Sequence, residues 1–155
     1  MTTARHADLR DVPRIMKILH AMHGQSRYAK WPINDEKLEA LVCTLIGNRD
    51  GVCLLAVDGD LIVGVMMGLV TEFFFSRERV VTELLIYVLP SHRGTWAALR
   101  LGHQFIKWAK NTDAVEIQAG ITAGIDDASA ERFYMVLGFS DMGRSFAKGL
   151  DHVRA

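Results

Sequence analysis

The stretch VLPSHRGTWAALRLGHQFIKWAK, residues 88–110, decides the fold of this chain, because a strand, a tight turn and a helix meet in it. The run VVTELLIYVL, residues 80–89, is almost continuously apolar, which is typical of a strand covered on both faces. Pro90 ends that run, and apolar residues at helical spacing continue to Lys110. The first N–H groups of such a helix have no intrahelical partner and attract phosphate.

The residues of the turn favour a phosphate site. Arg93 adds a positive charge, and Gly94, Ala97 and Ala98 are small where a ligand would approach the backbone. The alternative is an ordinary helix start with a solvated Arg93.

Hydrophobic periodicity predicts the remaining elements. In chain order they are helices over residues 12–24 and 34–47, strands over 52–57, 61–70 and 80–89, a helix over 94–110, a strand over 115–121 and a helix over 127–137. Asp11 and Asn34 are the expected N-caps, and residues 139–150 could add a strand or two. A hairpin at Gly59 and a strand–helix–strand crossover over 81–121 require a mixed sheet. We therefore predict an α/β fold, with residues 1–155 as a single domain.

Composition excludes several classes of protein. Lys plus Arg and Asp plus Glu number 18 each, so no net positive field attracts nucleic acid. Cys43 and Cys53 fit neither a zinc site nor a disulfide framework. The N-terminus is charged throughout and the longest apolar run, residues 61–70, is too short to cross a bilayer. We expect a cytoplasmic protein that binds neither membrane nor nucleic acid.

A second stretch, DASAERFYMVLGF at residues 127–139, helps to interpret the turn at residues 90–98. Together with VLPSHRGTWAA it resembles the GNAT superfamily of acyl-CoA-dependent N-acyltransferases. In that family a V-x-P-x-x-R-G-x-G-x-G/A turn holds the coenzyme A pyrophosphate, and an N-x-x-A-x-x-F-Y-x-x-x-G-F segment brings a tyrosine to the thioester. The order of elements matches as well, so the resemblance covers nearly the whole chain and implies the GNAT fold.

The resemblance implies acetyl-CoA as co-substrate. The coenzyme would lie along the backbone of Ile86, Tyr87 and Val88 and at the turn that comprises Arg93, Gly94, Thr95, Trp96, Ala97 and Ala98. Two residues depart from the family pattern. Trp96 stands at the second glycine, where an indole would crowd the phosphates unless it swings out. Asp127 replaces an asparagine that binds the coenzyme, and a carboxylate there would repel pyrophosphate.

The resemblance also implies direct attack of an amine on the thioester, with Tyr134 as the acid that protonates the leaving thiolate. A core tyrosine bonded to backbone is the alternative. Glu83 is the one carboxylate in an apolar strand, so burial could raise its pKa and make it the general base. It could equally be a paired or edge-facing glutamate, and Glu72 and Glu116 are lesser candidates. His20, His23, His92 and His103 form no ligand set, so we expect no metal.

The acceptor is not named by the sequence. Residues 24–33, with Ser26, Arg27, Tyr28 and Trp31, and the run Phe73–Phe75 would border the acceptor cleft or form the surface of a homodimer. The leading interpretation is an N-acetyltransferase acting on a primary amine of a small molecule or protein. The alternative is a catalytically weak GNAT-fold module that binds coenzyme A or another protein, which Trp96 and Asp127 favour.

Overall fold

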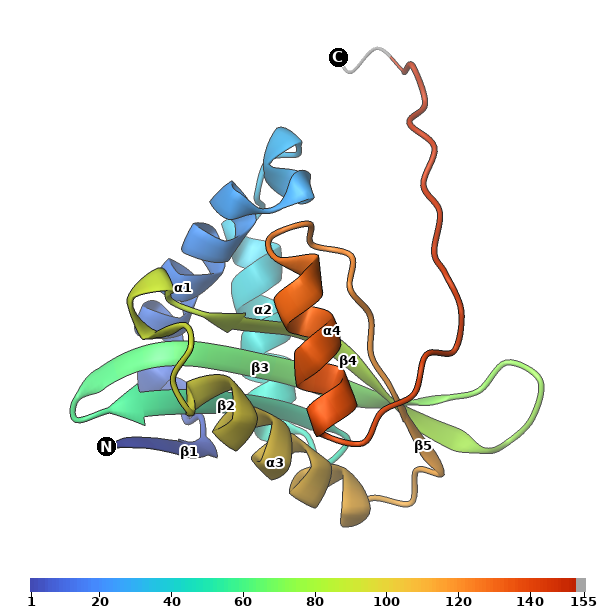
Figure 1. Ribbon diagram of the computed structural model, residues 1–155, viewed down its shortest axis with the longest axis horizontal. Coiled ribbons are helices and arrows are strands. Elements are labelled where there is room, and N and C mark those ends of the chain that lie inside the picture. The colour runs from blue at the N-terminus through green and yellow to red at the C-terminus, as the bar shows by residue number, and fades with distance from the viewer. Residues whose placement is uncertain (153–155) are drawn as a thin grey trace.

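The computed structural model describes residues 1–152, which form a twisted five-stranded sheet and four α-helices. In chain order the elements are β1 (Thr2–His6), α1 (Val12–Gln25), α2 (Asp35–Gly47), β2 (Gly51–Asp58), β3 (Leu61–Glu72), β4 (Arg79–Val88), α3 (Ala97–Lys110), β5 (Glu116–Gln118) and α4 (Asp127–Val136). The strands follow one another across the sheet in the order of the sequence (Figure 1). All pairs are antiparallel except β4 and β5, so the predicted mixed sheet is confirmed.

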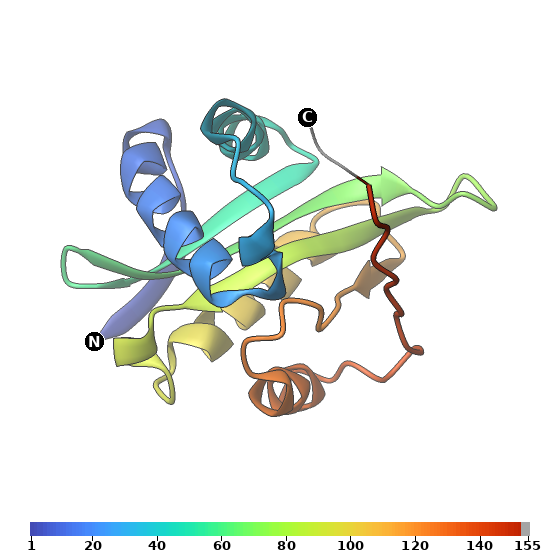
Figure 2. The same cartoon turned by 90° about the horizontal axis from the view of Figure 1, so that it is seen from above.

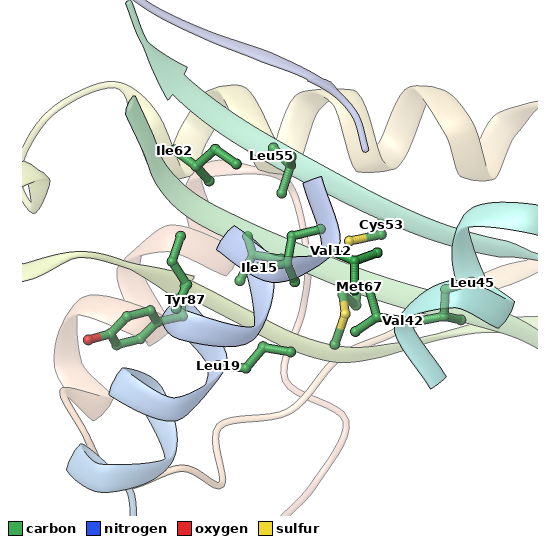
Figure 3. Packing of buried hydrophobic residues seen from close by; sticks show 12 residues of the cluster. Val12, Ile15, Leu19, Val42, Leu45, Cys53, Leu55, Ile62, Met67 and Tyr87 are labelled. Carbon is green, nitrogen blue, oxygen red and sulfur yellow. The ribbon is translucent and has the colours of Figure 1, made fainter. Parts of the chain in front are cut away.

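The helices cover both faces of the sheet (Figure 2). Helices α1 and α2 pack on one face, where Ile15, Val42 and Tyr87 are buried in a common cluster (Figure 3). Helix α3 packs on the other, where Leu101 and Phe105 are fully buried. None of the helices in residues 1–152 is both long and apolar enough to cross a lipid bilayer.

Of the two expected N-caps, Asn34 caps its helix and Asp11 does not. The side chain of Asn34 accepts a hydrogen bond from the Lys37 N–H at 2.9 Å and caps α2 as predicted. Asp11 precedes α1 but its side chain does not cap that helix. It is buried instead and accepts two hydrogen bonds from Arg5, at 2.7 and 2.9 Å, and one from Arg14 at 3.1 Å. This bidentate pair attaches β1 to the start of α1.

Several boundaries differ from the prediction. Strand β1 was not expected, α3 begins at Ala97 rather than at residue 94, and β5 is limited to Glu116–Gln118. Residues 139–152 form no strand, so the further strands allowed for the C-terminal segment are absent from the described part of the chain. That segment leaves the end of α4 and runs as an extended tail (Figure 1).

One irregularity in the sheet shapes the region beside β4. Met67 pairs with Leu85 and Gly68 pairs with Glu83, so Leu84 is an extra residue in β4 and forms a β-bulge. Gly68 is required opposite this point, because a Cβ there would lie 2.6 Å from the Phe105 ring. The bulge lies directly after the last residue pair of β4 and β5, and the chain that follows β5 no longer pairs with β4.

Candidate active site

A cleft opens between β4 and the chain that follows β5. The parallel pairing covers only Val80–Thr82 against Glu116–Gln118, so β4 has no strand partner on that side from Glu83 onward within residues 1–152. A cavity of about 290 Å³ lies there, which we call the inner cleft. Its walls are residues 83–88 of β4, the turn at 92–95, the segment 120–127 and α4. The free edge of β4 can therefore hydrogen-bond an extended ligand as an added strand would.

The predicted turn forms one end of the inner cleft. Pro90–His92 make a short 3₁₀ turn, and Gly94 adopts φ +78°, a conformation that side chains with a Cβ disfavour. Among the described residues, the N–H groups of Gly94, Trp96, Ala98 and Leu99 have no hydrogen-bond partner. These amides, together with the N-terminal dipole of the 14-residue helix α3, make a site suited to an anion.

Arg93 lies in this turn, but its guanidinium is already engaged. It donates from Nε to the Val88 carbonyl at 3.1 Å and from Nη2 to Gln25 Oε1 at 2.9 Å. The guanidinium carbon also lies 5.4 Å from the centre of the Tyr87 ring. Arg93 therefore connects the turn to the end of α1 while its charge remains beside the free amides.

Trp96 does not crowd the turn. Its backbone has φ −73° and ψ −3°, which any residue adopts, so the position does not require glycine here. The residue is 69% exposed and does not line the inner cleft. Of the two alternatives raised by the sequence, the structure shows the indole swung out.

Two carboxylates, not one, lie at the start of α4. Asp126 is the N-cap and accepts a hydrogen bond from the Ser129 N–H at 3.1 Å, while Asp127 is the first helical residue. Both line the inner cleft. The hydrogen bonds from Ser129 lower the pKa of Asp126, so this carboxylate is charged at neutral pH. The site thus combines amide donors and Arg93 at one wall with negative charge at the other.

Glu83 and Tyr134 meet inside the inner cleft. The Tyr134 hydroxyl donates to Glu83 Oε2 at 2.9 Å, and the Tyr134 side chain is 9% exposed. Burial raises the pKa of Glu83 to about 7, although its hydrogen bonds from Tyr134 and the Gly120 amide oppose the shift. Burial, followed by the charge of Glu83, raises the pKa of Tyr134 above its ordinary value. The side chain predicted as base and the one predicted as acid are direct partners.

Tyr134 also faces a second, larger cavity of about 900 Å³, which we call the outer cleft. Its walls come from the 3₁₀ turn Arg27–Lys30 and Trp31, the chain after β5, α4 and the C-terminal segment. Tyr28, Asp127 and Tyr134 line both clefts. The two cavities therefore share a wall at which Tyr134 lies.

The structure brings together most of the residues predicted for the site. The inner cleft is lined by Glu83, Ile86, Tyr87, Val88, Arg93, Gly94, Thr95, Ala98, Asp127 and Tyr134. Ala97 lies outside this lining, fully buried beneath the turn, and Thr95 Oγ1 accepts a hydrogen bond from its N–H at 3.3 Å. Trp96 lies outside it as well.

Other candidates are placed away from the clefts. Glu72 and Glu116 line neither cavity, and Phe73–Phe75 form the tip of the β3–β4 hairpin, so they do not border the acceptor cleft as expected. His20 contacts Asp35 at 2.6 Å and His23 contacts the Trp31 carbonyl. His92, which the sequence set aside as a metal ligand, lines the inner cleft, and its Nε2 lies 3.3 Å from Asp58 Oδ2.

Sequence reasoning missed Asp126 and Gly120, which line the inner cleft, and the contact by which Gln25 holds Arg93. Tyr28 was assigned to the acceptor side alone, and it lines both clefts. An aspartate directly before the predicted helix at residue 127 is a signal for the cap at Asp126. Gln25 and Gly120 carry no comparable signal, because their roles depend on contacts distant in the chain.

Comparison with known proteins connects these features to a family. None of the curated proteins matches this sequence. Among solved structures, the aminoglycoside acetyltransferase AAC(6')-Iy in complex with a CoA bisubstrate analogue is 15% identical, with a TM-score of 0.78 and coverage of 98% of this chain and 99% of that one. AAC(6')-IG from Acinetobacter haemolyticus is 19% identical, with a TM-score of 0.72 and coverage of 96% and 99%.

A ribosomal-protein-alanine N-acetyltransferase from Brucella melitensis biovar Abortus has the same fold at 17% identity, with a TM-score of 0.71 and coverage of 97% and 99%. At these identities the structural likeness establishes the fold and not the substrate. The model of the acetyltransferase (GNAT) family matches residues 13–139, which include both motifs and the whole inner cleft. The chain therefore belongs to the acetyltransferase (GNAT) family.

Proposed function

We propose that this protein is an acetyl-CoA-dependent N-acetyltransferase that moves an acetyl group to a primary amine by direct attack. The observation that carries the proposal is the hydrogen bond between Glu83, which lines the inner cleft, and Tyr134, which lines both clefts. Tyr134 can therefore reach a thioester in the inner cleft and an amine that enters from the outer one, with Glu83 beside it.

The coenzyme would occupy the inner cleft. Its pyrophosphate would accept hydrogen bonds from the free amides at Gly94, Trp96 and Ala98, beside the charge of Arg93. Its amide-containing arm would lie along the free edge of Ile86–Val88 as an added strand. A backbone N–H of this edge would polarise the thioester carbonyl.

The amine would enter through the outer cleft. Tyr28 and Trp31 stack at 5.5 Å on its wall, and Asp127, Glu131 and Asp141 supply carboxylates that can hold an ammonium group. Glu83 would accept a proton from the amine, directly or through water, because its pKa of about 7 leaves it largely ionised at slightly alkaline pH. Tyr134 would protonate the departing sulfur. Direct transfer needs no metal and no covalent enzyme intermediate.

Substitution of Tyr134 by Phe tests this assignment. The variant should bind acetyl-CoA with nearly unchanged affinity and turn over at least about tenfold more slowly, because general-acid catalysis typically contributes about a hundredfold or more. Tyr28→Phe is the matched control, since Tyr28 lines both clefts and the structure shows no contact of its hydroxyl with Glu83 within residues 1–152. Equal rates for wild type and Tyr134→Phe would show that Tyr134 is not the acid.

One observation favours a second function, a coenzyme A-binding module with little or no catalysis. Asp126 and Asp127 place two carboxylates in the cleft that would receive phosphates, and like charges weaken such binding. This alternative expects binding of acetyl-CoA without acetylation of any amine. Trp96, whose indole is swung out, no longer supports it.

A further inference from the structure

The hydrogen bond between Tyr134 and Glu83 has a direction, and that direction limits what Tyr134 can do. A phenol carries one proton, and an ionised carboxylate can only accept. In the contact of 2.9 Å the Tyr134 proton is therefore directed to Glu83 Oε2 while Glu83 is ionised. In this state the phenol cannot donate to a sulfur atom in the same cleft.

Protonation of Glu83 reverses the situation. A neutral carboxylic acid has one O–H donor, and the Tyr134 oxygen can accept it. The phenol proton is then free to turn toward another acceptor. We propose that Glu83 acts as the switch of Tyr134: when Glu83 takes a proton from the amine, the hydrogen bond between them reverses and the Tyr134 proton becomes available to the leaving thiolate. This inference rests on the proposed acetyl transfer.

The proton count of the reaction is consistent with this switch. An ammonium acceptor loses two protons as it becomes an amide, and the sulfur gains one. The first proton goes to solvent when the amine is freed for attack. Nitrogen then bonds to the carbonyl carbon and gives its second proton to Glu83. As the C–S bond breaks, sulfur takes the electron pair and the Tyr134 proton, and Glu83 returns its own proton to the phenol oxygen. Both side chains end as they began.

The groups packed around Glu83 leave Tyr134 as its one titratable hydrogen-bond partner among the described residues. Opposite Glu83 on β3 stands Gly68, which has no side chain, and from the chain after β5 the Gly120 amide donates to Glu83. Tyr134 on α4 is the titratable group in contact with it. The other titratable or charged side chains that line the inner cleft are Tyr28, Tyr87, His92, Arg93, Asp126 and Asp127, and none of these forms a hydrogen bond or ion pair with Glu83 among the described residues.

The raised pKa of Tyr134 explains why the phenol needs Glu83 as a partner. A phenol that ionises with difficulty is a poor acid unless the phenolate is neutralised as it forms. Protonated Glu83, in direct contact, can do this within the same event. Glu83 therefore orients the Tyr134 hydroxyl and returns a proton to it, in addition to accepting a proton from the amine.

A double-mutant cycle tests the switch. Tyr134→Phe should lower kcat at least about tenfold in the wild-type background and no more than about threefold in a Glu83→Gln background, because glutamine cannot return a proton to the phenol. Tyr28→Phe should change kcat by the same factor in both backgrounds, whatever that factor is, because the Tyr28 hydroxyl forms no hydrogen bond with Glu83 among the described residues. An equal loss from Tyr134→Phe in both would overturn the switch while leaving the acetyltransferase proposal intact. A wild type inactive on every amine would instead reject the proposed function.

A titration that requires no turnover tests the hydrogen bond between Tyr134 and Glu83 directly. The pKa of Glu83 can be followed by NMR of protein with ¹³C-labelled glutamate carboxyl groups, and wild type should titrate near 7. Tyr134→Phe should move the pKa of Glu83 upward, because the lost hydrogen bond favoured the charged form. Tyr28→Phe should leave it in place. An unchanged or lower value in Tyr134→Phe would overturn the switch, whether or not an acceptor amine is known.

Discussion

Glu83 Oε2 and Tyr134 Oη lie 2.9 Å apart although 51 residues separate them in the chain. The fold brings them together in two steps. Glu83 follows the last residue of β4 that pairs with β5, and α4 packs on α3 so closely that a Cβ at Gly102 would lie 3.0 Å from the Phe133 ring. The contact combines a carboxylate and a phenol at the junction of two cavities.

Glu83→Gln should make the stability of the protein less dependent on pH. The pKa of Glu83 is about 7 in the folded protein and about 4.5 in an unfolded chain, so the folded state binds more protons between these values. The free energy of unfolding of wild type therefore falls as the pH rises through this window, and glutamine lacks this contribution.

Urea unfolding at about pH 4.5 and about pH 8 measures the effect. Relative to wild type, Glu83→Gln should gain about 1–3 kcal/mol between the two pH values, since one unit of pKa corresponds to about 1.4 kcal/mol. A difference between the two proteins that stays constant with pH would mean that the pKa of Glu83 is not raised.

Gly94→Ala should destabilise the protein by about 1 kcal/mol and weaken acetyl-CoA binding. A Cβ at Gly94 would meet no atom within 4 Å, so the cost comes from φ +78° alone. Relaxation of the turn would move the free amides that face the proposed pyrophosphate. Gly24→Ala is the matched control, because Gly24 lies in α1 with equally open space and no positive φ. Thermal unfolding and calorimetry measure both, and unchanged affinity for Gly94→Ala would place the phosphate site elsewhere.

Trp96→Gly should change the affinity for acetyl-CoA by no more than about twofold, because the indole is exposed and lies outside the inner cleft. If the indole did crowd the phosphates, as the sequence allowed, this variant would instead bind acetyl-CoA more tightly. Calorimetry distinguishes the outcomes. A large gain would mean that the indole does obstruct the coenzyme, and a large loss that it packs against it.

Tyr87→Phe should leave the free energy of unfolding unchanged or raise it by about 1 kcal/mol. The Tyr87 hydroxyl is buried and, among the described residues, has no hydrogen-bond partner, which is costly for a polar group. Figure 3 shows the ring at the edge of the apolar cluster, with its hydroxyl directed away from the labelled side chains. The stacking of Arg93 does not need the hydroxyl. A loss of stability in urea unfolding would indicate a partner that satisfies it, such as a bound water.

Much of the fold was predictable from the sequence because its central elements carry strong local signals. The Asp58-Gly59-Asp60 turn, with Gly59 at φ +61°, joins β2 and β3 as its apolar flanks predicted. Strand β1 has no such signal. Residues Thr2–His6 are polar or charged, apart from Ala4, and are fixed by backbone pairing to β2 and by the Arg5–Asp11 ion pair.

The parts of the site that follow from local sequence were likewise predictable. The turn at Arg93 and Gly94 and the FY pair of α4 are contiguous motifs, and both line the inner cleft. The partnership of Glu83 with Tyr134 and that of Arg93 with Gln25 depend on long-range packing. The orientation of Trp96 depends on a backbone conformation that residue type does not specify. These features required the structure.

The proposed transfer of acetyl groups from acetyl-CoA to an amine has a direct test. Wild type is incubated with acetyl-CoA and a panel that includes aminoglycosides, polyamines and peptides with free N-termini, while thiol release and the mass of each amine are measured. At least one amine should gain an acetyl group in equal amount to the thiol released, at a rate that Tyr134→Phe lowers at least about tenfold. Binding of acetyl-CoA with no acetylated product across the panel would contradict the proposed transfer and favour the coenzyme A-binding module.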